Sequence, residues 1–485
     1  MKIKDLLQGV DVLSMQGVDG NQEVRGVSCD TRTLRPGELF VAVDGTAQDG
    51  RCFCAQALEQ GAAGVVCDRE ISCEAPAIRV GNARRALALM AANQYGHPAD
   101  GMTLVGVTGT NGKTTTTYLI QQLLEALTGQ SVGFIGTICA QIGEEILPSE
   151  RTTPDALTIH RLLRRMADRG CRYCVMEVSS HALALDRVYG LRFAVAAFTN
   201  LTQDHLDFHG TMERYAAAKA RLFGQCEQAV YNADDAWSKV ILQGCPCPKS
   251  SFGVAHSADL RAEAVSLHRS SVRFTAVTNG ERTAVEVPIP GSFTVYNGLT
   301  ALIVCQKLGF SLAQSARILY NVRGAKGRME VVPTPGRPYT VLIDYAHTPD
   351  ALEHVLTAVR DFTPGRVVAV FGCGGDRDRT KRPRMGAIAE RLADFTVLTN
   401  DNPRFEKPEA ILGDIAAGMS KKSKYTIIPD RAEAIAWALD HAQAGDTICL
   451  CGKGHETYVE VRGVQYHQDE REIVAHYFES NGETP

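Results

Sequence analysis

The sequence predicts an α/β protein of about three domains: a smaller α/β N-terminal domain, a central parallel sheet and a C-terminal doubly wound sheet. Two observations support this prediction. The chain has 485 residues, and domains of roughly 100–200 residues are usual. Strand-like apolar runs also alternate with helix-like segments through two long blocks, which is the pattern of parallel sheets covered by helices.

The expected elements follow the chain in order, with domain boundaries that we place at residues 1–99, 100–332 and 333–485. In the first block, apolar runs at 39–43 and 64–67 are typical of strands, and residues 83–95 have helical spacing. The segment 97–101, with its proline and glycine, indicates a linker to the second block.

The second block opens with a buried-strand run over 103–108, which a helix follows. Another helix is expected to begin with Thr153 as its N-cap and Pro154 at its first position. Strands at 173–178 and 195–199 continue the alternation.

The third block continues the strand–helix alternation with five strands and four helices, which predicts a Rossmann-like doubly wound sheet. Its expected strands cover 341–344, 367–371, 396–399, 425–428 and 447–451. Its expected helices follow Pro349 and cover 385–392, 411–419 and 432–442.

Composition excludes several classes of protein. The 51 basic and 55 acidic residues give a net charge of -4, so neither nucleic acid nor an anionic membrane is an expected partner. No apolar run approaches the roughly 18 residues of a membrane span, and the N-terminus lacks a signal-peptide pattern. We therefore expect a cytoplasmic protein, and a monomer by default. The 15 cysteines show no paired zinc spacing, so we interpret them as structural thiols.

A glycine-rich loop, Gly109-Thr110-Asn111-Gly112-Lys113-Thr114, lies between a predicted strand and a predicted helix. Glycines let backbone N–H groups face phosphates, and the helix N-terminus adds favourable partial charge. Lys113 is expected on the β- and γ-phosphates and the Thr114 hydroxyl on Mg²⁺. The spacing is a shorter GxxGKT variant of the usual loop, because Val107 stands five residues before Gly112. The loop predicts a central P-loop ATPase domain.

Polar side chains follow two other strands of this block. Glu177 ends one strand, and an acidic residue beside a phosphate loop is a natural Mg²⁺ ligand. His205 lies in the polar segment 199–210 after the next strand. Taken alone, His205 favours an ordinary loop histidine, and Lys219 favours an exposed helix lysine.

Together these motifs resemble the Mur ligase family, in the same order along nearly the whole chain. The matching segments are Thr108–Thr115, Glu177–His181, Thr199–Gly210, Lys219, Asn232–Asp235, Gly327–Glu330 and Asp344–Asp350. Folylpolyglutamate synthetases share the central pattern, but they resemble neither the N-terminal block nor the Asp401 motif described below.

The resemblance implies a catalytic set of Lys113, Glu177, His205 and Lys219. Thr114 and Glu177 would hold one Mg²⁺, and His205 with Lys219 a second, with Lys219 converted to a carbamate by CO₂. A bare ammonium would repel Mg²⁺, whereas a carbamate is an anionic oxygen ligand. The implied ATP contacts are Gly109, Thr110, Asn111, Gly112, Lys113, Thr114, Thr115, Asn297, Arg328 and Asp344. The implied contacts to UDP-MurNAc-L-Ala-D-Glu are Thr31, Thr46, Ala47, Gln48, Thr152, Thr153, Ser179 and Arg187.

The tetrapeptide Asp401-Asn402-Pro403-Arg404 follows a predicted strand and resembles a motif of the family members that add meso-diaminopimelate. Diaminopimelate is lysine with an additional carboxylate on its far carbon. A bidentate pair with Arg404 would recognise that carboxylate, whereas lysine would leave Arg404 desolvated and unpaired. Further implied contacts to the amino acid are Arg377, Gly452 and Glu456.

These features predict an ATP-dependent ligase that adds meso-diaminopimelate to UDP-MurNAc-L-Ala-D-Glu through an acyl phosphate, in peptidoglycan biosynthesis. Two alternatives share the fold: a lysine-adding ligase of the same family and a ligase like folylpolyglutamate synthetase. A third is a P-loop binding or regulatory ATPase without ligase activity, which would hydrolyse ATP without the muramoyl dipeptide and would not need Arg377, Arg404 and Glu456.

Overall fold

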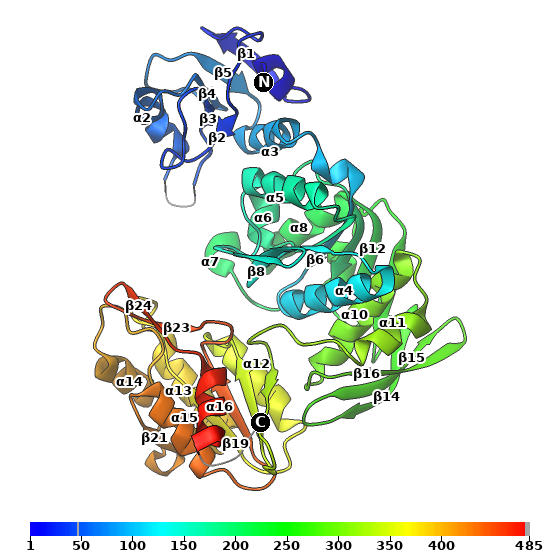
Figure 1. The fold of residues 1–485 in the computed structure, drawn as a ribbon, viewed down its shortest axis with the longest axis vertical. Helices are drawn as coiled ribbons and strands as arrows, with labels where there is room; N and C mark the ends of the chain where they lie inside the picture. The colour runs from blue at the N-terminus through cyan, green and yellow to red at the C-terminus, as the bar shows by residue number, and fades with distance from the viewer. Residues whose placement is uncertain (46–47, 481–485) are drawn as a thin grey trace. The chain divides into compact units, whose positions relative to one another are not determined.

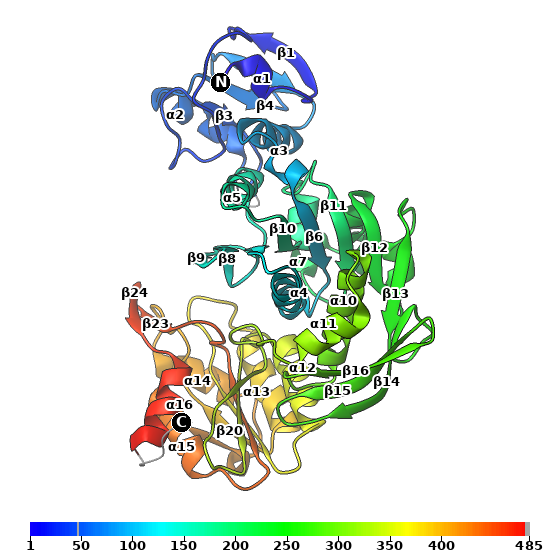
Figure 2. The ribbon, with the colours of Figure 1, turned by 45° about the vertical axis from the view of Figure 1, so that its right-hand side comes forward.

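The computed structural model describes residues 1–45 and 48–480 and shows an α/β protein (Figures 1 and 2). Thr46 and Ala47 lie outside the described residues. The chain divides into two compact units, Met1–Asp259 with Thr300–Leu312, and Leu260–Leu299 with the chain from Ala313. Among the described residues, no helix combines the length and apolarity needed to cross a membrane.

The N-terminal part of the first unit is a five-stranded sheet in the order β1-β5-β4-β3-β2. The strands are β1 (Val12–Gln16), β2 (Val27–Ser28), β3 (Leu39–Val41), β4 (Gly64–Cys67) and β5 (Ala77–Val80), parallel except for β1. Alternation along β3 places Leu39 and Val41 in a cluster with α3 (Ala83–Gln94), and Phe40 in a second cluster with α2 (Cys54–Glu59). Both faces are therefore covered.

The second sheet of this unit is centred on β6 (Thr103–Thr108), and six strands run parallel in the order β13-β12-β11-β6-β10-β7. The others are β7 (Gly133–Ile135), β10 (Tyr173–Glu177), β11 (Phe193–Phe198), β12 (Cys226–Asn232) and β13 (Lys249–Gly253). Antiparallel β8 (Cys139–Ile142) and β9 (Glu145–Pro148) extend the β7 edge. The strand order reverses at β6, which is where open α/β sheets bind ligands.

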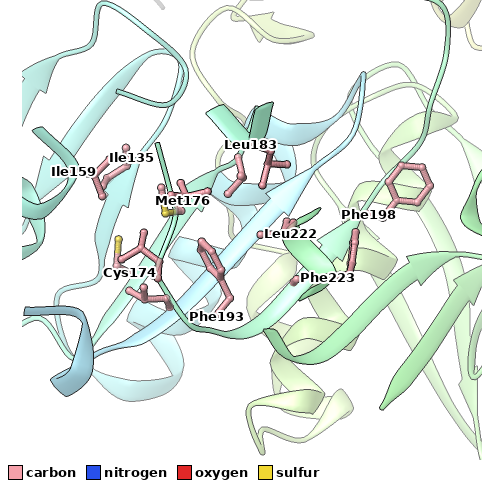
Figure 3. Packing of buried hydrophobic residues seen from close by; sticks show 14 of the residues in the cluster. Ile135, Ile159, Cys174, Met176, Leu183, Phe193, Phe198, Leu222 and Phe223 are labelled. Carbon is pink, nitrogen blue, oxygen red and sulfur yellow. The ribbon is translucent and has the colours of Figure 1, made fainter. Parts of the chain in front are cut away.

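Three helices pack against this second sheet: α4 (Lys113–Thr128), α5 (Ala156–Asp168) and α8 (Met212–Ala220). Figure 3 shows part of the apolar cluster that β10 and β11 share with α5 and its neighbours. The labelled members come from β7, α5, β10, α6 (Ser180–Ala184), β11 and the segment 221–224.

The predicted N-cap of α5 is wrong. The helix begins at Ala156, and Asp155 caps it by accepting a hydrogen bond from the Thr158 backbone N–H at 3.0 Å. The Thr153 hydroxyl is engaged elsewhere, because it donates to the Glu177 carbonyl at 2.8 Å and accepts from the Ser179 N–H at 3.0 Å. A tertiary contact has displaced a local capping preference.

The second unit contains antiparallel β14 (Leu260–Leu267), β15 (Val272–Thr278) and β16 (Glu281–Val287). Its main sheet has the order β17-β18-β22-β19-β20-β21, parallel except for β17. The strands are β17 (Glu330–Val332), β18 (Thr340–Asp344), β19 (Val367–Phe371), β20 (Phe395–Leu398), β21 (Tyr425–Ile427) and β22 (Thr447–Cys451). The last elements are α16 (Glu470–Ser480) and a hairpin of β23 (Tyr458–Val461) and β24 (Val464–His467), which the sequence did not predict.

Helices cover the main sheet of the second unit: α12 (Pro349–Arg360), α13 (Lys381–Leu392), α14 (Pro408–Ala416) and α15 (Arg431–Asp440). Ile343, Val370 and Leu450 of the central strands pack with α15 and α16 in one apolar cluster. The intervening residues Leu342 and Cys449 are buried as well. Strands buried on both faces are the mark of a doubly wound sheet.

Candidate active site

The glycine-rich loop connects β6 to α4 as predicted, and both of its glycines have positive φ, +153° at Gly109 and +84° at Gly112. A Cβ atom on Gly109 would lie 1.9 Å from the Thr199 hydroxyl oxygen. That hydroxyl donates to the Asn111 carbonyl at 2.7 Å. The end of β11 therefore packs so closely on the loop that only glycine fits at position 109.

Two lysines converge on this loop. The Lys113 ammonium donates to the carbonyls of Gly109 (3.0 Å) and Thr110 (2.8 Å). The Lys219 ammonium, on α8, donates to the same Gly109 carbonyl at 2.7 Å, and its side chain is fully buried. The interpretation of Lys219 as an exposed helix lysine, which its local sequence favours when taken alone, is therefore wrong. Burial, reinforced by the positive charge of Lys113, holds the pKa of Lys219 well below that of a free lysine.

The Glu177 carboxylate lies at the end of β10, fully buried beside the loop. It accepts hydrogen bonds from the Thr114 hydroxyl (2.9 Å), the Thr137 hydroxyl (3.0 Å) and the Thr137 backbone N–H (2.8 Å). A Cβ atom on Gly136 would lie 2.6 Å from the carboxylate. Sequence reasoning missed Gly136 and Thr137, although their place directly after β7 puts them at the same sheet edge.

His205 adopts a left-handed backbone, with φ of +53°, just before α7 (Leu206–His209). Its ring lies 4.7 Å from the His181 ring and 6.1 Å from the Tyr215 ring, between centroids. Partial burial, with a smaller effect of the nearby Lys113 and Lys219, lowers the pKa of His205 and favours the neutral, ligand form of imidazole. Within the described residues, no three His, Cys, Asp or Glu side chains are grouped closely enough to hold a metal by themselves.

A cleft of about 1520 Å³ lies in the first unit, and Thr31, Gln48 and Arg187 contribute to its walls. Its lining includes six arginines: Arg32, Arg84, Arg151, Arg161, Arg165 and Arg187. Burial lowers the pKa of Arg187 to about 10, and this side chain donates to the Thr153 carbonyl at 2.8 Å. Asp30, Asp44, Glu150, Asp155 and Asp186 also line the cleft, so it presents both cations and anions to a ligand.

The remaining residues expected at the dipeptide lie beside Glu177. The Thr152 and Thr137 hydroxyls are hydrogen-bonded at 3.0 Å, so Thr152 is one hydrogen bond away from the Glu177 carboxylate. Ser179 caps the short helix α6 by accepting from the Ala182 N–H at 3.2 Å. The structure therefore brings Thr152, Thr153 and Ser179 to the edge that carries the phosphate loop.

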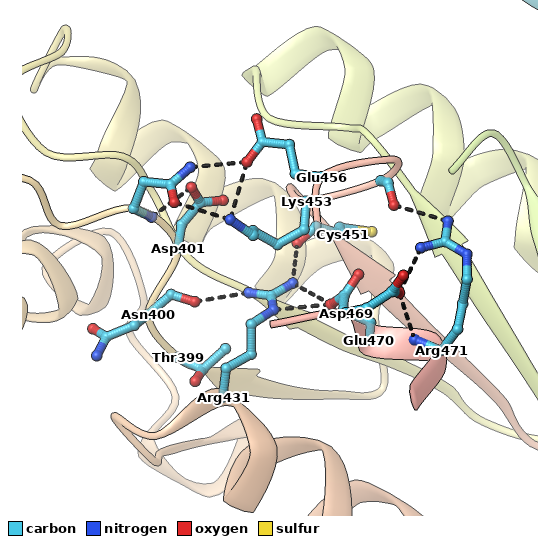
Figure 4. Close-up of polar contacts among 12 residues, drawn as sticks. Thr399, Asn400, Asp401, Arg431, Cys451, Lys453, Glu456, Asp469, Glu470 and Arg471 are labelled. Atoms are coloured by element: carbon cyan, nitrogen blue, oxygen red, sulfur yellow. Dashed lines mark hydrogen bonds and ion pairs between the residues drawn. The ribbon is translucent and has the colours of Figure 1, made fainter. Parts of the chain in front are cut away.

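In the second unit, Asp401-Asn402-Pro403-Arg404 follows β20 and meets the loop after β22 (Figure 4). The Asn402 amide donates to the Glu456 carboxylate at 2.9 Å. Gly452 has φ of +110°, and a Cβ atom there would lie 2.7 Å from an Asp401 carboxylate oxygen. Four of the residues expected at diaminopimelate, Asp401, Asn402, Gly452 and Glu456, are therefore neighbours.

Arg404 has a left-handed backbone with φ of +51°, and its chain runs beside β23. Its guanidinium donates through Nε to the Glu460 carboxylate at 3.0 Å and through Nη1 to the Gly375 carbonyl at 2.9 Å. Sequence reasoning missed Glu460, which belongs to the unpredicted hairpin. Arg377 is exposed, and none of the described residues pairs with its guanidinium.

Three residues expected at the nucleotide also lie in the second unit. Asn297 is buried in α10 (Phe293–Lys307). Asp344 ends β18 and accepts from the backbone N–H groups of Met329 and Ala346, both at 2.9 Å, and burial raises its pKa. The Arg328 guanidinium stacks 5.1 Å from the centre of the Tyr345 ring, and it moderates the pKa rise of Asp344.

Comparison with known proteins identifies the family. Residues 23–95 match the Mur ligase family catalytic domain, residues 107–305 the Mur ligase middle domain, and residues 327–454 the Mur ligase glutamate ligase domain. UDP-N-acetylmuramoyl-L-alanyl-D-glutamate–2,6-diaminopimelate ligase of Clostridium tetani is 42% identical and covers 99% of both chains. The enzyme of the same name from Geobacillus thermodenitrificans is 44% identical over 90% of this chain and 91% of its own.

A solved structure of a UDP-N-acetylmuramoyl-L-alanyl-D-glutamate–2,6-diaminopimelate ligase covers 100% of both chains at 33% identity, with a TM-score of 0.74. The fold, the order of the polar loops and these full-length relatives agree. The chain belongs to the Mur ligase family.

Proposed function

We propose that this chain is an ATP-dependent ligase that adds meso-diaminopimelate to UDP-MurNAc-L-Ala-D-Glu in peptidoglycan biosynthesis. The names of the full-length relatives support this function. The observation that carries the choice of amino acid is the network around Asn402. The Asn402 side chain donates to the Glu456 carboxylate and accepts from the Glu460 backbone N–H, and the Glu460 carboxylate accepts from the Arg404 guanidinium. The Glu456 carboxylate would bind a distal ammonium, and the Arg404 guanidinium would bind a distal carboxylate of the same ligand.

We assign one substrate to each proposed domain. Residues 1–99 would bind the UDP-MurNAc part, 100–332 would bind ATP, and 333–485 would bind the amino acid. The arginine-lined cleft suits a ligand with a diphosphate and carboxylates, and the loop at Gly109 suits the phosphates of ATP. We expect the enzyme to act as a cytoplasmic monomer.

The residues around the loop fit magnesium. The Thr114 hydroxyl and the Glu177 carboxylate are hard oxygen donors that already contact each other, so they would hold one Mg²⁺. Mg²⁺ typically takes one or two protein oxygens and completes its shell with phosphate oxygens and water, so no larger acidic cluster is required. When bound, Mg²⁺ would offset negative charge on the phosphates.

The fit of a second Mg²⁺ depends on the chemical state of Lys219. As an ammonium, Lys219 would repel the ion; as a carbamate, it would supply oxygen ligands together with the imidazole of His205. A carbamate forms only on a neutral amine. Burial that lowers the pKa of Lys219 favours that neutral form, so the site suits reaction with CO₂.

In the proposed reaction, the D-glutamate γ-carboxylate attacks the γ-phosphorus of ATP, the bond to the β,γ-bridging oxygen breaks, and ADP leaves. The neutral diaminopimelate amine then attacks the acyl carbon, phosphate leaves, and the amine loses a proton to give the amide. The Lys113 ammonium would exchange two loop carbonyls for the transferred phosphoryl group. Arg404 and Glu456 would orient the amine by binding the far end of the amino acid. No protein nucleophile is required, because positioning and electrostatics lower the barrier.

An assay of phosphate release tests this function. With ATP and UDP-MurNAc-L-Ala-D-Glu present, we expect release to require meso-diaminopimelate and to respond weakly to lysine or glutamate. Arg404→Ala should raise the KM for diaminopimelate by roughly 10- to 100-fold, since hydrogen bonds to charged groups contribute about 1.5–3 kcal/mol. Preference for lysine would favour the lysine-adding alternative, and dipeptide-independent release would favour a simple ATPase.

A further inference from the structure

Lys453 is a fully buried lysine between the 401–404 loop and the hairpin, and the reaction described above does not use it. Its ammonium donates to the Asn402 side-chain oxygen at 2.9 Å, to the Glu456 carboxylate at 3.0 Å and to the Tyr458 carbonyl. A lysine ammonium has three N–H donors. All three are committed to protein acceptors, so Lys453 acts on other residues rather than on a ligand.

The first of these residues is Asn402, whose amide is fixed in one orientation. Its Oδ1 accepts from the Lys453 ammonium and from the Glu460 backbone N–H at 2.8 Å, while its Nδ2 donates to the Glu456 carboxylate. A flipped amide would place its NH₂ against two donors and its oxygen against a carboxylate. Lys453 therefore contributes to the orientation in which Asn402 can hold Glu456.

The second is Glu456, whose two carboxylate oxygens differ. Oε2 accepts from both Lys453 and Asn402, whereas Oε1 accepts no hydrogen bond from the part of the chain that is described. In Figure 4, the second oxygen of Glu456 points away from Lys453. The side chain is 16% exposed. One edge of the carboxylate is thus held by the protein, and the other edge is open to a ligand.

We propose that Lys453 is a positioning residue that orients the open edge of Glu456 toward the distal ammonium of the incoming diamino acid. This inference rests on the proposed function, because it takes that ammonium as the ligand of Glu456. Without Lys453, one Asn402 hydrogen bond would hold the carboxylate, and a partly buried negative charge would lose its partner. The bound ammonium would then meet a mobile carboxylate.

The variant Lys453→Met tests this role, because methionine fills similar space without charge. We expect the KM for meso-diaminopimelate to rise by about 10- to 100-fold, the scale expected for loss of a hydrogen bond to a charged group. The KM values for ATP and UDP-MurNAc-L-Ala-D-Glu should stay unchanged. With 2-aminopimelate, which lacks the distal amine, native protein and Lys453→Met should have the same KM. An equal rise for both amino acids, or no rise for diaminopimelate, overturns the proposal.

A double variant keeps the test decisive if Lys453→Met does not fold. Lys453→Met combined with Glu456→Gln removes both charges of the pair, so no partly buried carboxylate is left without its ammonium partner. If Lys453 acts through Glu456, this double variant and Glu456→Gln alone should have KM values for diaminopimelate within about twofold of each other. A much larger KM in the double variant overturns the proposal. Native protein without diaminopimelate-dependent activity would instead refute the proposed function.

Discussion

The phosphate-loop edge of the first unit and the 401–404 edge of the second unit hold their cations in different ways. Both gather polar side chains where parallel strands end. At the first edge, the ammonium groups of Lys113 and Lys219 donate to neutral backbone carbonyls, including the shared Gly109 carbonyl. At the second, Lys453 and Arg404 are paired with carboxylates, those of Glu456 and Glu460.

This difference matches the charges of the proposed ligands. Neutral carbonyls are weaker acceptors for an ammonium group than phosphate oxygens, so these contacts can be exchanged for those of a polyanion such as ATP. Ion pairs leave little net charge, which suits diaminopimelate, with two ammonium and two carboxylate groups. The first edge attracts its ligand by charge, and the second selects its ligand by the orientation of groups that are already in place.

The largest effect should come from Lys113→Met, which removes the loop ammonium that we place on the transferred phosphoryl group. We expect kcat/KM in the phosphate-release assay to fall by about 10³-fold or more, since charge on the transferred phosphoryl group would lose its partner. The exposed Lys239 gives a matched control, and Lys239→Met should retain activity. Activity of Lys113→Met within about tenfold of native would show that Mg²⁺ alone supplies the charge at this edge.

Lys219→Met should lower activity by roughly 100-fold, the scale expected when a metal ligand or its support is lost. Its more specific signature is spectroscopic. With [¹³C]bicarbonate, native protein should show a carbamate carbonyl signal in ¹³C NMR that Lys219→Met lacks and Lys239→Met keeps. Because burial lowers the pKa of Lys219, the neutral amine gains population as pH rises through that lowered pKa. The signal should therefore grow with pH.

If native protein shows no carbamate signal at any pH, Lys219 does not react with CO₂. The comparison between the two edges would then change, because Lys219 would remain a second cation beside Lys113. A phosphate site with two permanent cations would not need the second Mg²⁺ that we propose.

The sequence predicted the elements whose signals are local. Strand β6, its glycine-rich loop and helix α4 are consecutive in the chain, so apolar spacing and glycine positions were sufficient. The same holds for β20 and the 401–404 loop. Both polar edges were expected, because strand ends in parallel sheets lie at a common edge.

Features that depend on distant parts of the chain could not be predicted from spacing alone. Lys219 has an alanine-rich helical neighbourhood, and its burial follows from a contact with Gly109, 110 residues away. Thr153 is a good N-cap by type, but Glu177 and Ser179 engage it. Glu460 pairs with Arg404 across 56 residues, through a hairpin whose short, exposed strand β24 gives little periodic signal in the sequence.

A smaller effect is expected from Glu460→Ala, which removes an ion pair without touching the proposed ligand. Arg404 would lose the acceptor of its Nε–H and some of its fixed orientation. We expect the KM for diaminopimelate to rise about fivefold, in line with roughly 1 kcal/mol for a partly exposed pair. The exposed Glu409 provides the control variant Glu409→Ala. A fall in KM would mean that Glu460 competes with the ligand for Arg404, contrary to a preformed site.

The smallest effect concerns stability, through His455 in the loop that carries Lys453 and Glu456. Its ring packs 4.9 Å from the Tyr345 ring centre, and burial, reinforced by Arg328, lowers its pKa to about 4. Between pH 6.5 and pH 4, His455 is protonated in the unfolded chain but stays neutral in the folded chain, because its unfolded pKa is about 6.5. The contribution of His455 to stability is therefore complete above pH 6.5 and lost as pH falls toward 4.

His455→Phe isolates this contribution, because phenylalanine keeps a ring beside Tyr345 and has no titratable group. Other buried histidines, such as His160, also titrate in this range, so the useful quantity is the difference between two proteins. Between pH 7 and pH 4, native protein should lose about 1–2 kcal/mol more stability to denaturant than His455→Phe, after allowance for partial exposure. Parallel pH profiles would mean that the 452–456 loop opens to water before the second unit unfolds. The second edge would then be less preformed than its ion pairs indicate, and its contrast with the phosphate-loop edge would weaken.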